Sequence, residues 1–121
     1  MNKISILMSV YKKDNPEYLI EAFESLKNQT EFFYELVLIK DGTLTIQLDR
    51  IIDKYKKAIK IKPIIISTNI GLPKALNIGI KKVKTDWVAR FDSDDICHKN
   101  RFKTLNEIIE IYGDEIDIFG T

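Results

Sequence analysis

Short apolar runs alternate with helical stripes along the whole of this sequence. Four short apolar runs have the length of strands; they are residues 4–11, 35–42, 59–67 and 86–91. The first two have the near-continuous hydrophobicity of strands that are buried in the sheet. After each run, apolar residues recur at helical spacing; the stripes are Leu19, Phe23 and Leu26, then Leu48, Ile51, Ile52 and Tyr55, then Leu72, Leu76, Ile80 and Val83, and finally Phe102, Leu105, Ile109 and Tyr112. A fifth strand is expected at 116–120. This alternation predicts an α/β fold with an open, mostly parallel sheet and flanking helices.

Local signals refine the boundaries of these elements. Asn15 and Pro16 are typical of a helix N-cap followed by the first helical residue. Pro63 lies inside the third apolar run and lacks a backbone N–H, so that strand is expected at an edge of the sheet or at a bulge.

Composition narrows the class of protein. The 121 residues suit one domain, and the net charge of +1 gives no field that would favour nucleic acid or an anionic membrane. Cys97 is the only cysteine, so an internal disulfide is excluded, in agreement with a reducing compartment. The N-terminal run is too short for a signal peptide, and no run approaches the roughly 20 apolar residues of a membrane span. We therefore expect a cytoplasmic protein.

Polar clusters follow the predicted strands, at the edge of a parallel sheet where ligands bind. They are residues 11–14, 41–43, 67–71 and 92–95. In the last of these, Asp92 and Asp94 stand where two carboxylates could share one hard cation, Mg²⁺ or Mn²⁺. Such an Asp-Ser-Asp-Asp is more often a polar loop with an aspartate capping the next helix, near Asn100. Because Asp41 and Asn69 are expected at the same edge, convergence on one ligand becomes the favoured reading.

The polar clusters and their flanking segments resemble one known family. The matching pieces are "ISILMSVYKKDNPEYLIEAFESLKNQT", "ELVLIKDGT", "TNIGLPKALNIGIKKVKTDWVARFDSDDI" and "NRF", which run in order over essentially the whole chain. Together they resemble the nucleotide-sugar-binding half of family 2 glycosyltransferases, which have the Rossmann-like GT-A fold. The resemblance implies an inverting transfer of sugar from a nucleotide-diphospho-sugar, with a UDP-sugar favoured, to an acceptor hydroxyl during polysaccharide or cell-surface glycan synthesis.

The resemblance also implies roles for individual residues. Val10 and Tyr11 match the strand end that lines the base pocket, and Asp41 matches the residue that accepts a hydrogen bond from the base. The loop that borders the nucleotide is matched by Asn69, Gly71 and Lys74. Asp92 and Asp94 match the Asp-x-Asp motif, in which the first approaches the ribose or a metal-bound water and the second binds Mn²⁺ or Mg²⁺ directly. Asp95 is expected to cap local structure.

The sequence departs from the family in two places. The common Asp-Asp-Gly-Ser reads Lys40-Asp41-Gly42-Thr43, so a cation replaces one acidic group and the identity of the base is put in question. No residue matches the family's general base, which is expected beyond Thr121 together with the acceptor-binding half. Residues 1–121 are therefore expected to form the donor site, to be inactive alone, and to self-associate through an exposed sheet edge or face.

Alternative functions stay open at this stage. One is a non-catalytic nucleotide-binding or interaction module. A phosphatase of the haloacid-dehalogenase type is disfavoured, because Ile39 stands where its nucleophilic aspartate would be and the covalent step is therefore excluded. His98 is expected at the surface or a helix cap rather than near a metal, and Cys97 is expected to pack. For a full-length enzyme, a glycan or lipid-linked acceptor is expected, and the inner face of the membrane is a further expected location.

Overall fold

The structure is a computed structural model, and it describes residues 4–115. Strands and helices alternate along the chain, as the sequence predicts. The strands are β1 (Ile4–Val10), β2 (Leu36–Asp41), β3 (Ile61–Ile66) and β4 (Trp87–Arg90). The helices are α1 (Pro16–Lys27), α2 (Ile46–Tyr55), α3 (Leu72–Ile80) and α4 (Arg101–Tyr112). The fifth strand predicted at 116–120 lies outside the described residues.

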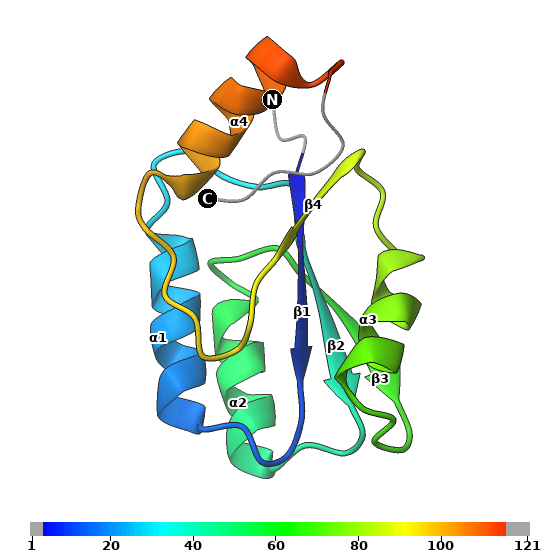
Figure 1. Ribbon diagram of the computed structural model, residues 1–121. Helices are drawn as coiled ribbons and strands as arrows, with labels where there is room; N and C mark the ends of the chain where they lie inside the picture. Colours follow the sequence, from blue (N-terminus) through cyan, green and yellow to red (C-terminus); the bar gives the residue numbers. More distant parts are fainter. Residues whose placement is uncertain (1–3, 116–121) are drawn as a thin grey trace.

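The four strands form one parallel sheet in the order β3-β2-β1-β4. All the described strands run in the same direction, so their carboxyl ends gather at one edge, the lower edge in Figure 1. Strand β1 pairs with β2 over five residue positions, from Ile6 opposite Leu36 onward. Its pairing with β4 ends earlier, at Leu7 opposite Arg90. This arrangement confirms the predicted open parallel α/β sheet.

The helices divide between the two faces of the sheet. Helices α1 and α2 cover one face, and α3 packs on the opposite face against β1 and β2 (Figure 1). The chain steps outward from β1 to β2 to β3 and then returns past β1 to β4. Because crossovers between parallel strands are right-handed, this reversal places α3 on the other face. The reversal makes a switch point between β1 and β4, where α/β sheets bind ligands.

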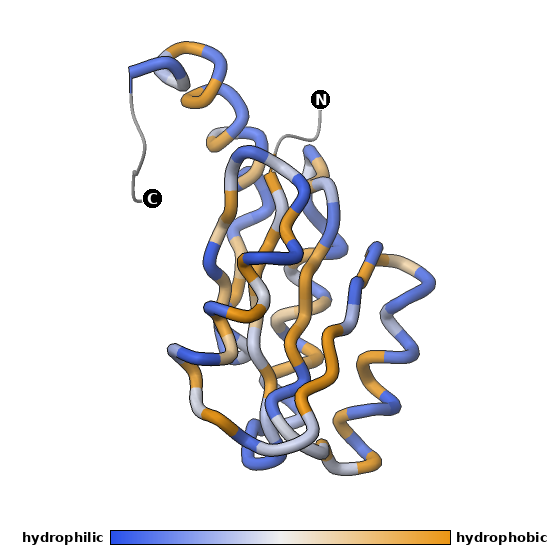
Figure 2. Tube along the Cα trace, turned by 90° about the vertical axis from the view of Figure 1, so that its right-hand side faces the viewer, coloured by the Kyte–Doolittle hydropathy of each residue, from blue (hydrophilic) through white to orange (hydrophobic). Residues whose placement is uncertain are grey.

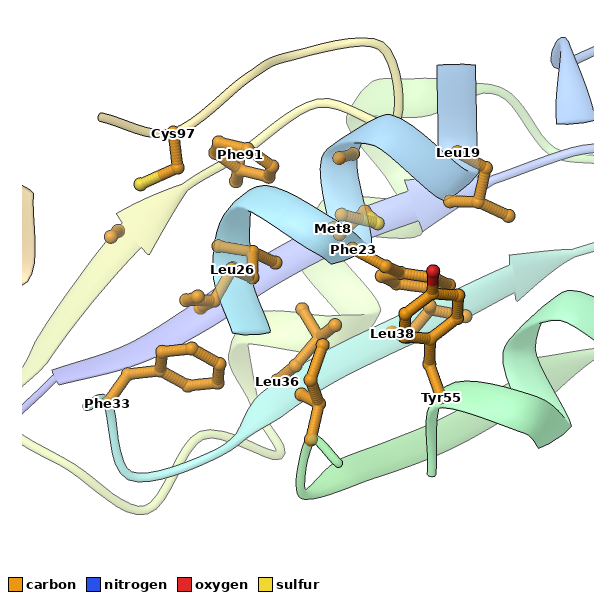
Figure 3. Close-up of a cluster of buried hydrophobic side chains, with 14 of the residues drawn as sticks. Met8, Leu19, Phe23, Leu26, Phe33, Leu36, Leu38, Tyr55, Phe91 and Cys97 are labelled. Carbon is orange, nitrogen blue, oxygen red and sulfur yellow. The ribbon is translucent and has the colours of Figure 1, made fainter. Parts of the chain in front are cut away.

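The larger core lies between the sheet and helices α1 and α2. Figure 3 shows side chains from both helices meeting those of β1 and β2. The rings of Phe23 and Tyr55 lie 5.1 Å apart, above Leu38 of β2. The Tyr55 hydroxyl donates a hydrogen bond to the Glu24 carboxylate, which joins the two helices at the rim of this core. Burial in this cluster is the largest cause that raises the pKa of Tyr55 to about 12, and the Glu24 contact adds to the rise.

The opposite face carries a smaller core of four buried residues, Leu7, Val37, Ile39 and Ala75. Gly79 of α3 lies directly on it, and a Cβ at that position would meet the side chains of Leu7 and Ile39. Figure 2 shows the apolar stretches of the strands inside the molecule, with both hydrophobic and hydrophilic residues along the helices. Within residues 4–115, no helix is long and apolar enough to cross a membrane.

Strand β3 is an edge strand, and Pro63 fits it. Leu36 donates its N–H to the Lys60 carbonyl, and Gly42 donates to the Ile66 carbonyl. The backbone groups of the even-numbered residues of β3 therefore face β2, and the nitrogen of Pro63 faces away. The register continues through Pro63 without interruption, so the structure has the edge strand and not the bulge.

Candidate functional site

A pocket of about 570 Å³ lies at the carboxyl edge of the sheet. This volume is in the range of small-molecule sites. The loops that follow β1, β3 and β4 contribute to it, together with the last residue of β2. Its lining residues are Ser9, Tyr11, Lys13, Asp14, Asn15, Tyr18, Asp41, Asn69, Gly71, Leu72, Asp92, Ser93 and Asp94. The pocket spans the switch point between β1 and β4, where the topology favours a ligand.

Most of the residues singled out in the sequence meet in this pocket; they are Tyr11, Asp41, Asn69, Gly71, Asp92 and Asp94. Val10 is fully buried in the core, between the two lining residues Ser9 and Tyr11, so its side chain is not part of the wall. Lys74 lies in the first turn of α3 and is exposed, outside the set of lining residues. The binding roles of all these residues remain predictions.

Asp41 organises one end of the pocket. The residue is 4% exposed, and its carboxylate accepts three hydrogen bonds from the loop that precedes α3. The donors are the backbone N–H groups of Ile70, at 2.8 Å, and Gly71, at 3.1 Å, and the side-chain amide of Asn69, at 3.2 Å. A buried carboxylate needs such partners, and here they also fix the loop. Asp41 therefore holds residues 69–71 against the end of β2.

Gly42 allows that loop to approach so closely. Its φ of +84° is in the left-handed region, where glycine is favoured. A Cβ at this position would lie 2.8 Å from the backbone nitrogen of Asn69, which is too close for any real side chain. The Asp41-Gly42 pair thus supplies both the acceptor and the space for the Asn69 loop.

Lys40, the departure from the family pattern, points out of the pocket. Successive residues of a strand face opposite sides of a sheet, and Asp41 faces the pocket. The Lys40 Nζ forms an ion pair of 3.0 Å with Asp49 of α2. Lys40 is not among the lining residues. The replacement therefore changes the contact between β2 and α2 and adds no cation to the pocket wall.

The acidic loop, residues 92–95, forms the other end of the pocket. One carboxylate oxygen each from Asp92, Asp94 and Asp95 lies within 4.8 Å of the other two, and all three side chains are exposed. Asp95 accepts a hydrogen bond of 3.0 Å from the Asp92 N–H, so it caps a turn within the loop, as expected for a capping residue. It does not cap α4, which begins after Asn100 without a side-chain cap. Arg90 pairs with Asp92 at 2.9 Å.

The acidic loop has the donor chemistry that a hard divalent cation requires. Carboxylate oxygens suit Mg²⁺ and Mn²⁺, which keep several positions for water and substrate phosphates. The exposure of Asp92 and Asp94 leaves room for such ligands on the pocket side. Asp92 and Asp94 line the pocket and Asp95 does not, so the first two fit the predicted metal-binding role.

Asp14 and Ser93 line the pocket although the sequence did not single them out. One carboxylate oxygen of Asp14 accepts hydrogen bonds from the Tyr11 N–H, at 3.1 Å, and from the Ser93 hydroxyl, at 3.0 Å. Burial raises the pKa of Asp14 above its ordinary value; these two hydrogen bonds oppose the rise, and the charges of Asp94 and Asp92 add to it. The only signal in the sequence was the position of Asp14 in the polar cluster after the first strand.

Residues 25–30, Ser-Leu-Lys-Asn-Gln-Thr, anchor the chain between β4 and α4. The Ser25 hydroxyl accepts a hydrogen bond of 2.9 Å from the Cys97 N–H. Gln29 donates to the His98 carbonyl at 2.8 Å, and Thr30 donates its N–H to the Lys99 carbonyl at 2.8 Å. These residues at the end of α1 fix the segment that follows the acidic loop.

Neither Cys97 nor His98 belongs to the pocket. Cys97 is buried beside Phe91 in the main core (Figure 3), and burial raises the pKa of its thiol. The packing role expected for Cys97 is therefore confirmed. His98 accepts a hydrogen bond from the Asn100 N–H just before α4 and is exposed, as expected for a surface or helix-end position.

Known proteins share this sequence and this fold. The family described as "Glycosyl transferase family 2" matches residues 5–120. An uncharacterized glycosyltransferase of Haemophilus influenzae is 41% identical over 98% of this chain and 46% of its own length. The UDP-Gal:alpha-D-GlcNAc-diphosphoundecaprenol beta-1,3-galactosyltransferase of Escherichia coli is 38% identical over 93% of this chain and 41% of its own length. The chain thus spans less than half the length of these relatives.

A solved structure supports the same assignment. S. aureus TarS in complex with UDP-GlcNAc superposes with a TM-score of 0.80 and 30% identity, over 92% of this chain and 32% of TarS. The parallel sheet, its flanking helices and the pocket at its carboxyl edge thus have the GT-A architecture that the sequence predicted. With the family matched from residue 5 to residue 120, the chain belongs to glycosyl transferase family 2.

Proposed function

We propose that this chain forms the donor site of a glycosyltransferase that uses a UDP-sugar. The observation that carries the proposal is one pocket that holds Tyr11, Asp41 and Asn69 at one end and Asp92 and Asp94 at the other. A polar end beside an aromatic ring suits a base and ribose, and a carboxylate end suits a diphosphate bridged by a cation. The UDP-GlcNAc bound to TarS and the UDP-Gal in the name of the E. coli relative support uridine as the base.

Within this proposal, Asp92 and Asp94 hold Mn²⁺ or Mg²⁺. The ion would stabilise the negative charge that develops on the departing diphosphate. Tyr11 borders the base, and the 69–71 loop, positioned by Asp41, closes the side of the nucleotide pocket. Since Asp41 is already engaged by three donors, its hydrogen bond to a base would be an additional one, on a carboxylate that accepts about four. Val10 and Lys74 are proposed to contribute through backbone and through the long flexible side chain, respectively.

Transfer also requires a general base for the acceptor hydroxyl. Asp92 and Asp94 are committed to the cation, and Asp14 is engaged by Tyr11 and Ser93. We therefore place the base in the part of the protein beyond Thr121, as the greater length of the relatives supports. Direct attack from the face opposite the diphosphate gives inversion at the sugar. A lipid-linked acceptor, as in the name of the E. coli relative, would place the reaction at a membrane face.

Nucleotide binding by the purified chain tests the donor site. UDP and UDP-sugars with Mn²⁺ should raise the melting temperature, and AMP or NAD should not. At a ligand concentration about 100 times Kd, the gain in unfolding free energy is about 2.7 kcal/mol. Absence of both heat in calorimetry and stabilisation for every nucleoside diphosphate would contradict the proposal. Release of UDP by the full-length protein, dependent on an acceptor, then tests the transfer step.

A further inference from the structure

The two ends of the pocket are joined by few backbone contacts. Strands β1 and β4 pair only as far as Leu7 and Arg90, and the Phe91 N–H makes the last bond, to the Leu7 carbonyl. Beyond that point β1 continues beside β2, whereas the chain after β4 turns away toward α4 (Figure 1). The sheet therefore does not set the distance between Tyr11 and the acidic loop.

One side-chain hydrogen bond spans this gap. Among the described residues, the bond from the Ser93 hydroxyl to the Asp14 carboxylate, at 3.0 Å, is the only hydrogen bond between residues 8–15 and the acidic loop. The same Asp14 oxygen accepts the Tyr11 N–H at 3.1 Å, and the Asp14 N–H donates to the Tyr11 carbonyl at 3.0 Å. One carboxylate oxygen of Asp14 thus joins the backbone N–H of Tyr11 to the hydroxyl of Ser93.

Ser93 stands between the two proposed metal-binding residues. A restraint on its hydroxyl consequently restrains the backbone from which both Asp92 and Asp94 project. Both Asp14 and Ser93 are partly buried, so this hydrogen bond is less exposed to competition from water than one at the open surface.

We infer that Asp14 is a positioning residue, which sets the spacing between the base end and the diphosphate end of the donor site by accepting the Ser93 hydroxyl. This inference rests on the proposed donor site. Asp14 acts here as a hydrogen-bond acceptor, and not as a ligand of the cation. A ligand that spans both ends, such as UDP with Mn²⁺, depends on the spacing, whereas uridine occupies the base end alone and does not.

Binding measurements on three single variants and one double variant of the purified chain test the role. Ser93→Ala removes the inter-loop bond and leaves the Tyr11–Asp14 turn in place. Asp14→Ala removes both. Asp14→Asn keeps an oxygen that can accept from Tyr11 and Ser93 but removes the charge. The probes are UDP with Mn²⁺, uridine alone, and Mn²⁺ alone followed by electron paramagnetic resonance.

Ser93→Ala should weaken the binding of UDP with Mn²⁺ by roughly 3- to 10-fold, the size expected for one net hydrogen bond. Its uridine affinity should stay within about twofold, because that probe needs no fixed spacing. Adding Ser93→Ala to Asp14→Ala should cause no further loss, since both changes break the same bond. Asp14→Asn should bind UDP with Mn²⁺ close to the wild-type level.

Three outcomes overturn the inference while the donor site stands. The first is an additive loss of UDP affinity in the double variant. The second is an equal loss of affinity for UDP and for uridine in Ser93→Ala. The third is an affinity for Mn²⁺ alone that falls below the wild-type value by the same factor in Asp14→Asn and in Asp14→Ala. The last result would make Asp14 a ligand of the cation. A wild-type chain that binds neither UDP nor uridine would remove both proposals.

Discussion

The two ends of the pocket differ in how their carboxylates are buried and paired. At the Asp41 end, the carboxylate is buried, and three donors from residues 69–71 satisfy it before any ligand arrives. At the acidic-loop end, Asp92, Asp94 and Asp95 lie together and exposed, with Arg90 as the one cation paired to them among the described residues. The first end gains its order from folding. The second holds negative charge in excess, which the proposed cation would balance.

This contrast predicts where a substitution costs stability and where it costs binding. Changes at the Asp41 end should unfold the protein more readily, because they leave buried groups without partners. Changes at the acidic loop should leave stability nearly untouched, because exposed like charges contribute little favourable energy to the fold.

Asp41→Ala should have the largest effect. It leaves the two backbone N–H groups of Ile70 and Gly71 without their acceptor, and it leaves the Asn69 amide with only the backbone carbonyl of residue 41; the expected cost is about 3 kcal/mol of unfolding free energy. Urea denaturation measures this loss. Asp41→Asn, which keeps the shape and one acceptor oxygen, should lose less. A loss below about 1 kcal/mol in Asp41→Ala would show that this end is not organised by the carboxylate.

Gly42→Ala comes next, with an expected loss of about 2 kcal/mol from the left-handed backbone and the contact with Asn69. Gly71→Ala is the matched control, because its φ of +89° carries a similar backbone cost while a Cβ there meets no atom within 4 Å. The difference between the two variants in urea denaturation isolates the close approach of the Asn69 loop. Equal losses would mean that the approach contributes nothing.

Asp94→Asn should leave the unfolding free energy within about 0.5 kcal/mol of the wild type. It should abolish the gain in UDP affinity that Mn²⁺ provides, measured by calorimetry with and without the ion. If that gain is tenfold, the loss is about 1.4 kcal/mol of binding free energy. Asp95→Asn serves as the control and should matter less, since Asn can still accept the Asp92 N–H. Retention of the Mn²⁺ effect in Asp94→Asn would remove its assignment as a ligand.

The strands and helices were predictable because the spacing of apolar residues along the sequence indicates which positions are buried. Each apolar run became a strand within one or two residues of its expected bounds, and Pro63 indicated an edge strand through its missing N–H. The strand order was not predicted, because it depends on which strands pair across long separations. The contact between Asp14 and Ser93 was missed for the same reason, because the two residues are 79 positions apart.

The family resemblance had a different limit. It matched Val10 and Lys74 by position, but position in an alignment does not tell which way a side chain points. In the structure Val10 faces the core and Lys74 lies outside the lining of the pocket. Likewise, the replacement at Lys40 looked like a change in the site until the alternation of β2 placed it toward Asp49.

The position of Pro63 in an edge strand affects the tendency of the protein to aggregate. Residues 61–66 include the run Ile64-Ile65-Ile66, and Ile65 is 76% exposed, so this strand has the composition of an aggregation-prone segment. A strand added from another molecule would need a donor from every second residue along the outer side of β3. Pro63 supplies none at the centre of the strand, and Lys60 and Lys62 place positive charge beside it. Pro63, Lys60 and Lys62 therefore disfavour edge-to-edge pairing along β3, which is an edge strand among the described residues.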